Sequence, residues 1–326
     1  MTVFVTGGSG LVGGALVARL IHRGDDVVAL ARSDEAAAKL EAKGARTVRG
    51  DILDEAAMTE GMRGSDLLYH VAGINTFCPT DPAALFHANV RGAEIAVRAA
   101  KAAGVRRIVL TSSAATLGEE GGTVGTEKSP HRGSYMSVYE RSKHEGEVAA
   151  LAAAKNAGIE LVAVLPSSVQ GPGRAGGTGR ILIAYLNGKL KAFVDTRISL
   201  VDIDDTIEAH VLAAERGKPG ERYLISGATI TSLEALDIVS GIGGVRHDVR
   251  LLPAPVARVV GAAVEAGFRV RGKKPPVCRE MIRTLLHGHN YDGSYAAAEL
   301  GLSYTPVEDT LRRTIEWARS EGLVRV

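Results

Sequence analysis

Short apolar runs alternate with longer amphipathic runs over the first two-thirds of the chain. The apolar runs are mostly continuous stretches of Val, Ile and Leu, as expected for strands that are covered on both faces. A strand–helix–strand order of this kind predicts an α/β fold with a doubly wound parallel sheet and right-handed crossovers. The predicted strands are Val3–Thr6, Val27–Ala31, Arg46–Val48, Leu67–Val71, Arg107–Leu110 and Leu161–Leu165, and the main helices are Leu11–Arg23, Pro82–Gly104 and Tyr135–Gly158.

A glycine-rich turn follows the first predicted strand and opens the first predicted helix. Its glycines stand at positions 7, 10 and 13. Gly7 permits the tight turn, Gly10 lets the backbone approach a pyrophosphate, and Gly13 lets the helix pack close to the strand. The start of the helix offers unpaired N–H groups and a positive dipole end to phosphates. We therefore predict a Rossmann-type dinucleotide-binding unit, with a glycine turn that binds nothing as the alternative.

The last third of the chain is less regular. The segment Gly171–Gly179 is rich in Gly and Pro, and similar breaks follow it. We expect residues 1–170 to form the dinucleotide-binding domain and residues 171–326 to form mainly a smaller, mixed α/β substrate-binding region, some segments of which return to the sheet. The elements predicted there are helices at Ile181–Leu190, Thr206–Arg216, Ser232–Ser240, Cys278–Leu286 and Pro306–Glu321, and a strand at Arg222–Ser226.

Composition narrows the class of protein. Hydrophobic residues make up 45% of the 326 residues and charged residues 23%, which is typical of a soluble globular chain. The net charge of +2 supplies no general electrostatic reason to bind nucleic acid or an anionic membrane. The apolar stretch Val256–Phe268 is too short to span a bilayer. Because Cys78 and Cys278 form no ligand-spaced cluster, we predict a cytoplasmic protein without a metal site.

The end of the second predicted strand bears on the choice of cofactor. NAD-binding units usually carry an acid there, which accepts hydrogen bonds from the adenosine ribose. This chain has Ala31, followed by Arg32 and Ser33, and a guanidinium with a hydroxyl suits a 2′-phosphate. We therefore predict NADP. NAD stays possible because Asp34 and Glu35 are near, although both equally suit the first turn of a helix.

Residues after the third and fourth predicted strands lie where ligands of open α/β sheets bind. Asp51 either accepts the adenine amino group, with Ile52 packed on the ring, or caps the next helix. Val71, Ala72 and Gly73 are small enough to leave room for a cofactor.

Three side chains suggest catalysis. Tyr139 and Lys143 are four residues apart and therefore on one face of a predicted helix. A neighbouring ammonium and a positive nicotinamide ring lower the pKa of a phenol from about 10 toward working pH, so that it can exchange a proton with a carbonyl oxygen. Such a pair alone is usually a surface feature. Ser113, at the end of the fifth predicted strand, adds a hydroxyl that can orient the substrate oxygen.

These residues together resemble the extended short-chain dehydrogenase/reductases. The similarity covers nearly the whole chain and looks closest to the dihydroflavonol 4-reductase-like branch and the hopanoid-associated sugar epimerase group. The residues that carry it are the glycine turn, Asp51, the Val-Ala-Gly strand end, Asn89, Ser113, Tyr139 with Lys143, the loop Pro166–Gly173, the segment Leu200–Asp205 and Trp317.

The resemblance assigns roles to individual residues. Ser113 would polarise the substrate oxygen, with Ser112 as the alternative. Tyr139 would be the acid/base, and Lys143 would hold the nicotinamide ribose and lower the pKa of Tyr139. Asn89 would be structural. The complete expected cofactor-binding set is Gly7, Ser9, Gly10, Leu11, Val12, Arg32, Ser33, Asp51, Ile52, Val71, Ala72, Gly73, Tyr139, Lys143, Pro166, Ser168 and Val169.

Departures from the family pattern separate the possible functions. Ala114 and Ala115 stand where sugar-nucleotide dehydratases carry acids, which disfavours dehydration. Ala31 disfavours an epimerase, which usually has an acid there. The leading hypothesis is thus an NADP-dependent oxidoreductase of a ketone or secondary alcohol on a small or lipophilic metabolite. The alternatives are an NAD-retaining sugar epimerase and a non-catalytic dinucleotide-sensing protein. Relatives of this type often dimerise, so we expect a homodimer.

Overall fold

The computed structural model describes residues 1–325, and its centre is a seven-stranded parallel sheet of order β10-β6-β5-β4-β1-β2-β3. This order reverses direction between β1 and β4, as in a doubly wound nucleotide-binding fold. The prediction of a Rossmann-type α/β fold is confirmed. The strands are β1 (Thr2–Thr6), β2 (Asp26–Ala31), β3 (Arg46–Arg49), β4 (Leu67–His70), β5 (Arg107–Thr111), β6 (Glu160–Pro166) and β10 (Arg222–Ile225).

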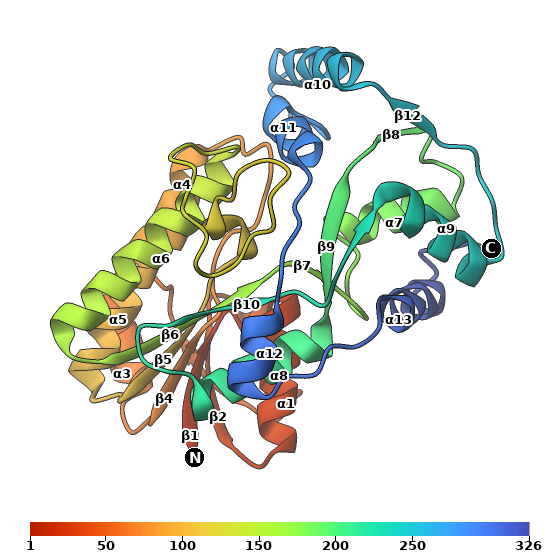
Figure 1. The fold of residues 1–326 in the computed structure, drawn as a ribbon. Helices are drawn as coiled ribbons and strands as arrows, with labels where there is room; N and C mark the ends of the chain where they lie inside the picture. The colour runs from red at the N-terminus through yellow and green to blue at the C-terminus, as the bar shows by residue number, and fades with distance from the viewer. Residues whose placement is uncertain (326) are drawn as a thin grey trace.

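Helices cover both faces of the sheet (Figure 1). Within β1, Val3 and Val5 point into one apolar core and Phe4 into the other, because successive side chains of a strand leave on opposite faces. The first core packs against α1 (Leu11–His22), α2 (Asp34–Glu41), α8 (Ile203–Arg216) and α12 (Ser294–Leu300); the second packs against α3 (Glu55–Met62), α5 (Gly92–Ala103) and α6 (Val138–Ala157).

The helix predicted over Pro82–Gly104 is interrupted. It consists of α4 (Pro82–Phe86), a π-helical turn at His87–Arg91 and then α5. The buried Asn89 in the turn accepts a hydrogen bond from the Ile74 amide at 2.8 Å and donates to the Ser142 hydroxyl at 2.9 Å. Asn89 therefore ties the loop after β4 to α6, which agrees with the structural role expected for it.

The rest of the chain forms two small sheets and further helices beside the carboxyl ends of the main strands (Figure 1). The predicted strand at Arg222–Ser226 returns to the main sheet as β10, parallel to β6. The remaining elements are β7 (Ser168–Gln170), β8 (Ala192–Val194), β9 (Arg197–Asp202), β11 (Ala228–Thr231), β12 (Arg250–Leu252), α7 (Thr178–Leu186), α9 (Ser232–Gly243), α10 (Ala254–Arg269), α11 (Arg279–His287), α13 (Val307–Ser320) and the 3-10 turn η2 (Ala114–Leu117).

The two cysteines correct one step of the sequence analysis. Cys78 and Cys278 form a disulfide across 200 residues of sequence, with Cα atoms 5.8 Å apart. Disulfides are typical of oxidising compartments, so the cysteines do not support a reducing one. The pairing was missed because sequence alone does not show which distant cysteines meet. Within residues 1–325, no helix is both long and apolar enough to cross a membrane.

Candidate active site

The glycine turn is shaped to hold a diphosphate. A side chain at Gly7 would place its Cβ 2.6 Å from the Ala72 amide nitrogen, and one at Gly13 would approach the Gly7 carbonyl oxygen to 2.2 Å. Gly10 is the N-cap of α1 and supplies no side-chain cap. The first N–H groups of α1, on Leu11 and Val12, are therefore free to meet phosphate oxygens. Ser9 lies exposed in the same turn.

The residues after β2 differ in what their side chains contact. Arg32 is exposed and forms no ion pair within residues 1–325, so its guanidinium is available to a phosphate. The Ser33 hydroxyl caps α2 by accepting a hydrogen bond from the Ala36 amide at 3.2 Å. Asp34 and Glu35 occupy the first turn of α2, as the sequence allowed.

Asp51 does not cap the helix that follows it. Asp54 is the N-cap of α3 and accepts a hydrogen bond from the Ala57 amide at 3.0 Å. Asp51 instead stabilises the turn after β3 through the Leu53 amide at 3.0 Å. The capping alternative for Asp51 is therefore wrong. Ile52 packs against Gly92, where an added Cβ would lie 2.9 Å from Ile52 Cδ1.

The segment after β4 lies between the glycine turn and α6. Val71 and Ala72 touch Gly7, and a Cβ at Gly73 would lie 2.9 Å from Asn89 Oδ1 and 3.7 Å from Lys143 Nζ. These small residues thus let three elements meet at the carboxyl edge of the sheet.

The two serines after β5 have different partners. Ser112 is buried and donates to the carboxylate of Glu147 on α6. Ser113 caps η2 by accepting a hydrogen bond from the Ala115 amide at 3.3 Å, and its side chain is close enough to Tyr139 to oppose the rise in the pKa of that phenol. The structure thus brings Ser113, and not Ser112, to the tyrosine.

Tyr139 and Lys143 lie one turn apart near the start of α6. Burial raises the pKa of Tyr139, while the hydrogen bond with Ser113 and the charge of Arg174 oppose that rise. Burial lowers the pKa of Lys143 to about 8, partly offset by Glu147. Lys143 Nζ donates to the Thr111 carbonyl oxygen at 2.8 Å. Arg174 is therefore a cation that opposes the rise in the pKa of Tyr139.

The loop after β6 lies beside this group. Pro166 ends β6 and is fully buried, and Val169 on β7 packs into the first core. The Ser168 hydroxyl lies 2.9 Å from the Thr178 hydroxyl, which joins β7 to the start of α7. The backbone then turns toward the glycine turn, since a Cβ at Gly173 would lie 2.8 Å from Leu11 Cδ1.

Arg174 in this loop is a cation without a carboxylate partner among residues 1–325. Its side chain is half-buried, and its Nε is buried with no hydrogen-bond acceptor. The guanidinium lies against Gly177, where an added Cβ would be 2.7 Å from Nη2. Burial lowers the pKa of Arg174, and the nearby phenol of Tyr139 opposes this.

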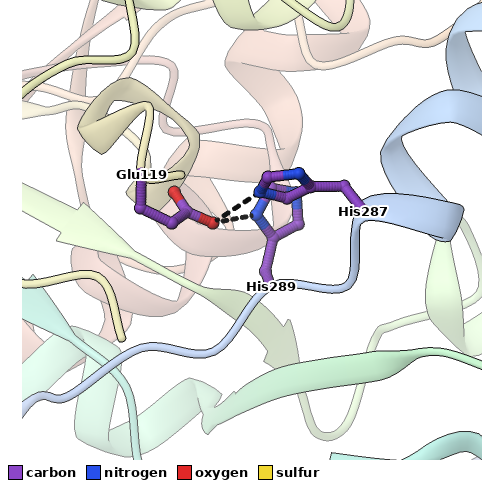
Figure 2. Close-up of side chains that lie close together, drawn as sticks. All are labelled: Glu119, His287 and His289. Carbon is purple, nitrogen blue, oxygen red and sulfur yellow. Dashed lines mark hydrogen bonds and ion pairs between the residues drawn. The ribbon is translucent and has the colours of Figure 1, made fainter. Parts of the chain in front are cut away.

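A second polar group was not anticipated from the sequence. Figure 2 shows Glu119, from the loop after η2, facing His287 and His289 from the segment between α11 and α12. His289 Nδ1 lies 2.6 Å and His287 Nε2 3.4 Å from Glu119 Oε1. Burial alone would raise the pKa of Glu119, but these histidines lower it to about 2. The sequence analysis did not find this group because Glu119 is distant in sequence from the two histidines.

This group joins two segments at the edge of the site. The Tyr291 hydroxyl lies 2.8 Å from His289 Nδ1, and Arg132 Nη1 donates to the Glu119 carbonyl oxygen at 3.1 Å. The Gly125 amide donates to the Asn290 carbonyl oxygen at 2.8 Å. The three facing groups have the chemistry of metal ligands, and among residues 1–325 Glu119 Oε2 and His287 Nε2 are buried without a hydrogen-bond partner.

Comparison with known proteins places this site in a family. The profile described as the NAD dependent epimerase/dehydratase family matches residues 3–226. The chain belongs to this family. It is also 31% identical over 330 residues to a putative dihydroflavonol 4-reductase of Synechocystis, covering 99% of this chain and 96% of the relative. The family-level resemblance found in the sequence is confirmed, and the chain is an NAD(P)-dependent enzyme.

Other members of the family differ in their substrates. A 2-alkyl-3-oxoalkanoate reductase of Shewanella oneidensis is 29% identical over 337 residues, covering 95% of this chain and 84% of the relative. The structure of a UDP-glucuronic acid 4-epimerase of Bacillus cereus, solved with UDP-glucuronic acid and NAD, superposes with a TM-score of 0.79 at 21% identity, covering 98% of this chain and 100% of the epimerase. The family thus holds both reductases and epimerases on one fold.

Proposed function

We propose that this enzyme is an NADP-dependent ketone reductase, or secondary-alcohol dehydrogenase, that works through Ser113, Tyr139 and Lys143. The observation that carries the proposal is that Ser113, the buried Tyr139 and Lys143 come together at the carboxyl end of β5, where Lys143 donates to the Thr111 carbonyl oxygen. Two hydroxyls in that arrangement can bind one carbonyl oxygen between them.

The chain's part in the reaction follows from these positions. A bound nicotinamide cofactor supplies the hydride that reaches the carbonyl carbon. Ser113 donates a hydrogen bond that orients the carbonyl oxygen, and Tyr139 gives that oxygen its proton. Lys143, held by the Thr111 carbonyl, stands one helical turn from Tyr139 and binds the ribose hydroxyls. In the reverse direction Tyr139 takes the proton from the alcohol.

The cofactor preference rests on the end of β2. Ala31 leaves no carboxylate for the ribose hydroxyls, and the exposed guanidinium of Arg32 follows it directly. A guanidinium and a phosphate form a charge-assisted pair. These features support NADP over NAD. They also favour a reductase that exchanges its cofactor over an epimerase that retains it.

For the substrate, we propose a ketone with a carboxylate close to it, such as a 3-oxo acid. Arg174 supports this, because a half-buried guanidinium beside Tyr139 with no carboxylate partner needs an anion to balance it. The relative from Shewanella oneidensis is named for a substrate of this class.

Cofactor titration tests the proposal. We expect NADPH to bind more tightly than NADH, and Arg32→Ala to weaken NADPH binding roughly 10- to 100-fold while NADH binding hardly changes. The preferred cofactor is then offered with a ketone panel that includes 3-oxo acids. Protein that purifies with NAD and converts sugars without consuming added cofactor would identify an epimerase instead.

A further inference from the structure

Helix α10 exposes an apolar face to solvent. This 16-residue helix buries only Ala257 and Gly261, and it packs on α11 so closely that a Cβ at Gly261 would lie 2.6 Å from Ile282 Cγ1. Figure 1 shows α10 at the outer edge of the C-terminal region, away from the main sheet. Val259 is 69% exposed and Val270, which follows the helix, is 88% exposed.

The exposed apolar side chains form one stripe. Val256, Val259, Val260 and Ala263 are related by steps of three and four residues, and Val270, the C-cap, stands seven residues after Ala263, so all five lie along one side of the helix. All five are exposed, and no charged residue interrupts the stripe. Large apolar patches on a soluble chain usually mark an interaction surface.

Basic residues are concentrated on the other side of α10 and in the segment that follows it. Between residues 254 and 274, five basic residues stand against the single acid Glu265, for a local net charge of +4. Because the whole chain carries +2, the remainder carries −2. The positive charge is thus concentrated at α10, which the overall balance did not reveal. The basic residues are Arg258, Arg269, Arg271, Lys273 and Lys274.

The acid pairs with only one of these cations. Glu265 accepts a hydrogen bond from Arg269 Nε at 2.8 Å and from the Arg279 amide at 3.0 Å, so it is already satisfied within the protein. Arg258 and Arg271 have no carboxylate partner within residues 1–325. They are free to meet anions outside the protein.

We propose that α10 and the basic segment after it bind the surface of an anionic lipid bilayer. An apolar stripe flanked by cations is the arrangement that lies in the plane of a membrane interface, with the valines in the acyl boundary and the cations at the headgroups. A second copy of this chain fits less well, because a two-fold contact would set the same cations against each other.

A groove of about 610 Å³ lies beside the proposed membrane surface. Arg258 and Ala262 of α10 line one side, and Pro79 and Val138 line the other. The rest of its lining is mostly charged and includes Glu265, Arg269, Arg279, Glu280 and Arg283. The groove therefore adds further cations beside α10.

Vesicle sedimentation tests the proposal on the full-length protein. We expect binding to vesicles of phosphatidylcholine with about 30% phosphatidylglycerol, little binding to phosphatidylcholine alone, and weaker binding as salt increases. Val259→Asp should weaken binding at least about tenfold. Leu233→Asp is the matched control, since Leu233 is an exposed apolar residue on α9, and it should bind like the wild type.

Arg271→Gln with Lys273→Gln provides a second variant that leaves the apolar stripe intact, and it should weaken binding through charge alone. All variants should keep the wild-type rate with a water-soluble ketone. The proposal is overturned if wild-type protein stays unbound with anionic vesicles, or if Val259→Asp binds as well as wild type. It is also overturned if the wild type is a dimer without lipid and Val259→Asp is a monomer, because a second copy then covers this face.

Discussion

Two opposing effects act on the proton of Tyr139: burial of its phenol, and the neighbouring side chains of Arg174 and Ser113. Burial favours the neutral phenol, which is the form needed to protonate a ketone, while Arg174 and Ser113 favour the phenolate. The first effect keeps the proton on the tyrosine and the second lets it leave. Lys143, one helical turn away, donates to the Thr111 carbonyl oxygen at 2.8 Å.

Arg174 carries the first prediction. If its guanidinium holds a substrate carboxylate, the wild type should prefer a 3-oxo acid over the methyl ester of that acid by roughly 10- to 100-fold in kcat/KM, the value of a charge-assisted hydrogen bond. Arg174→Met should abolish the preference and leave the ester rate almost unchanged. Arg180→Met is the control, because Arg180 is exposed on α7 six residues later.

Two outcomes would contradict this role. Equal rates with acid and ester in the wild type would show that no carboxylate is bound, while the reductase function would still stand. A loss of NADPH affinity in Arg174→Met with the acid preference intact would place Arg174 on the cofactor diphosphate, which the closeness of Gly173 to Leu11 allows.

At the scale of elements, two connections hold the C-terminal region to the site. The Glu119 cluster joins the loop after η2 to the segment after α11, and the disulfide joins the loop after β4 to the start of α11. The loop after β4 also carries Phe77, whose ring lies 5.9 Å from the ring of Tyr139. Movements of α11 should therefore reach Tyr139.

Glu119→Gln tests the first connection through its pH dependence. The folded-state pKa of Glu119 is lowered to about 2 from 4.5, so its stabilisation is complete above pH 4.5 and is lost as the pH falls toward 2. At pH 7 the variant should lose about 2 kcal/mol of unfolding free energy. The gap to wild type should narrow near pH 3, as measured by chemical denaturation. Glu120→Gln, which changes an exposed neighbour, should have the same unfolding free energy as wild type. A difference between Glu119→Gln and wild type that stays constant from pH 7 to pH 3 would contradict this explanation.

The sequence predicted the elements whose local pattern decides their structure. The strands that are buried on both faces are visible as continuous apolar runs. The glycine turn is visible because glycines stand where another part of the backbone must come close. Both signals lie within a few consecutive residues. The π-helical turn around Asn89 was missed because it depends on contacts with Ile74 and Ser142. Short strands such as β8 and β12 were missed because three residues carry no clear periodicity. Arg174 and the Glu119 cluster depend on distant partners, which a single sequence does not connect.

At the scale of the whole molecule, the disulfide closes a very long loop between the nucleotide-binding part and the region around α11. Removing such a link typically costs about 2–4 kcal/mol, because the unfolded chain gains freedom. We expect reductant to lower the melting temperature of wild type by several degrees. Cys78→Ala with Cys278→Ala should show the lower temperature without any response to reductant. Two titratable thiols in unfolded, unreduced protein would contradict the pairing.

The central claim is that Tyr139 protonates a carbonyl oxygen while hydride arrives from a bound cofactor. The most direct measurement follows deuterium from NADPH labelled at C4 of the nicotinamide into the product of a ketone, in wild type and in Tyr139→Phe. We predict deuterium on the carbinol carbon and a rate about 10²- to 10⁴-fold lower in the variant, with NADPH binding unchanged. A near wild-type rate in Tyr139→Phe, or a product without deuterium, would contradict the account.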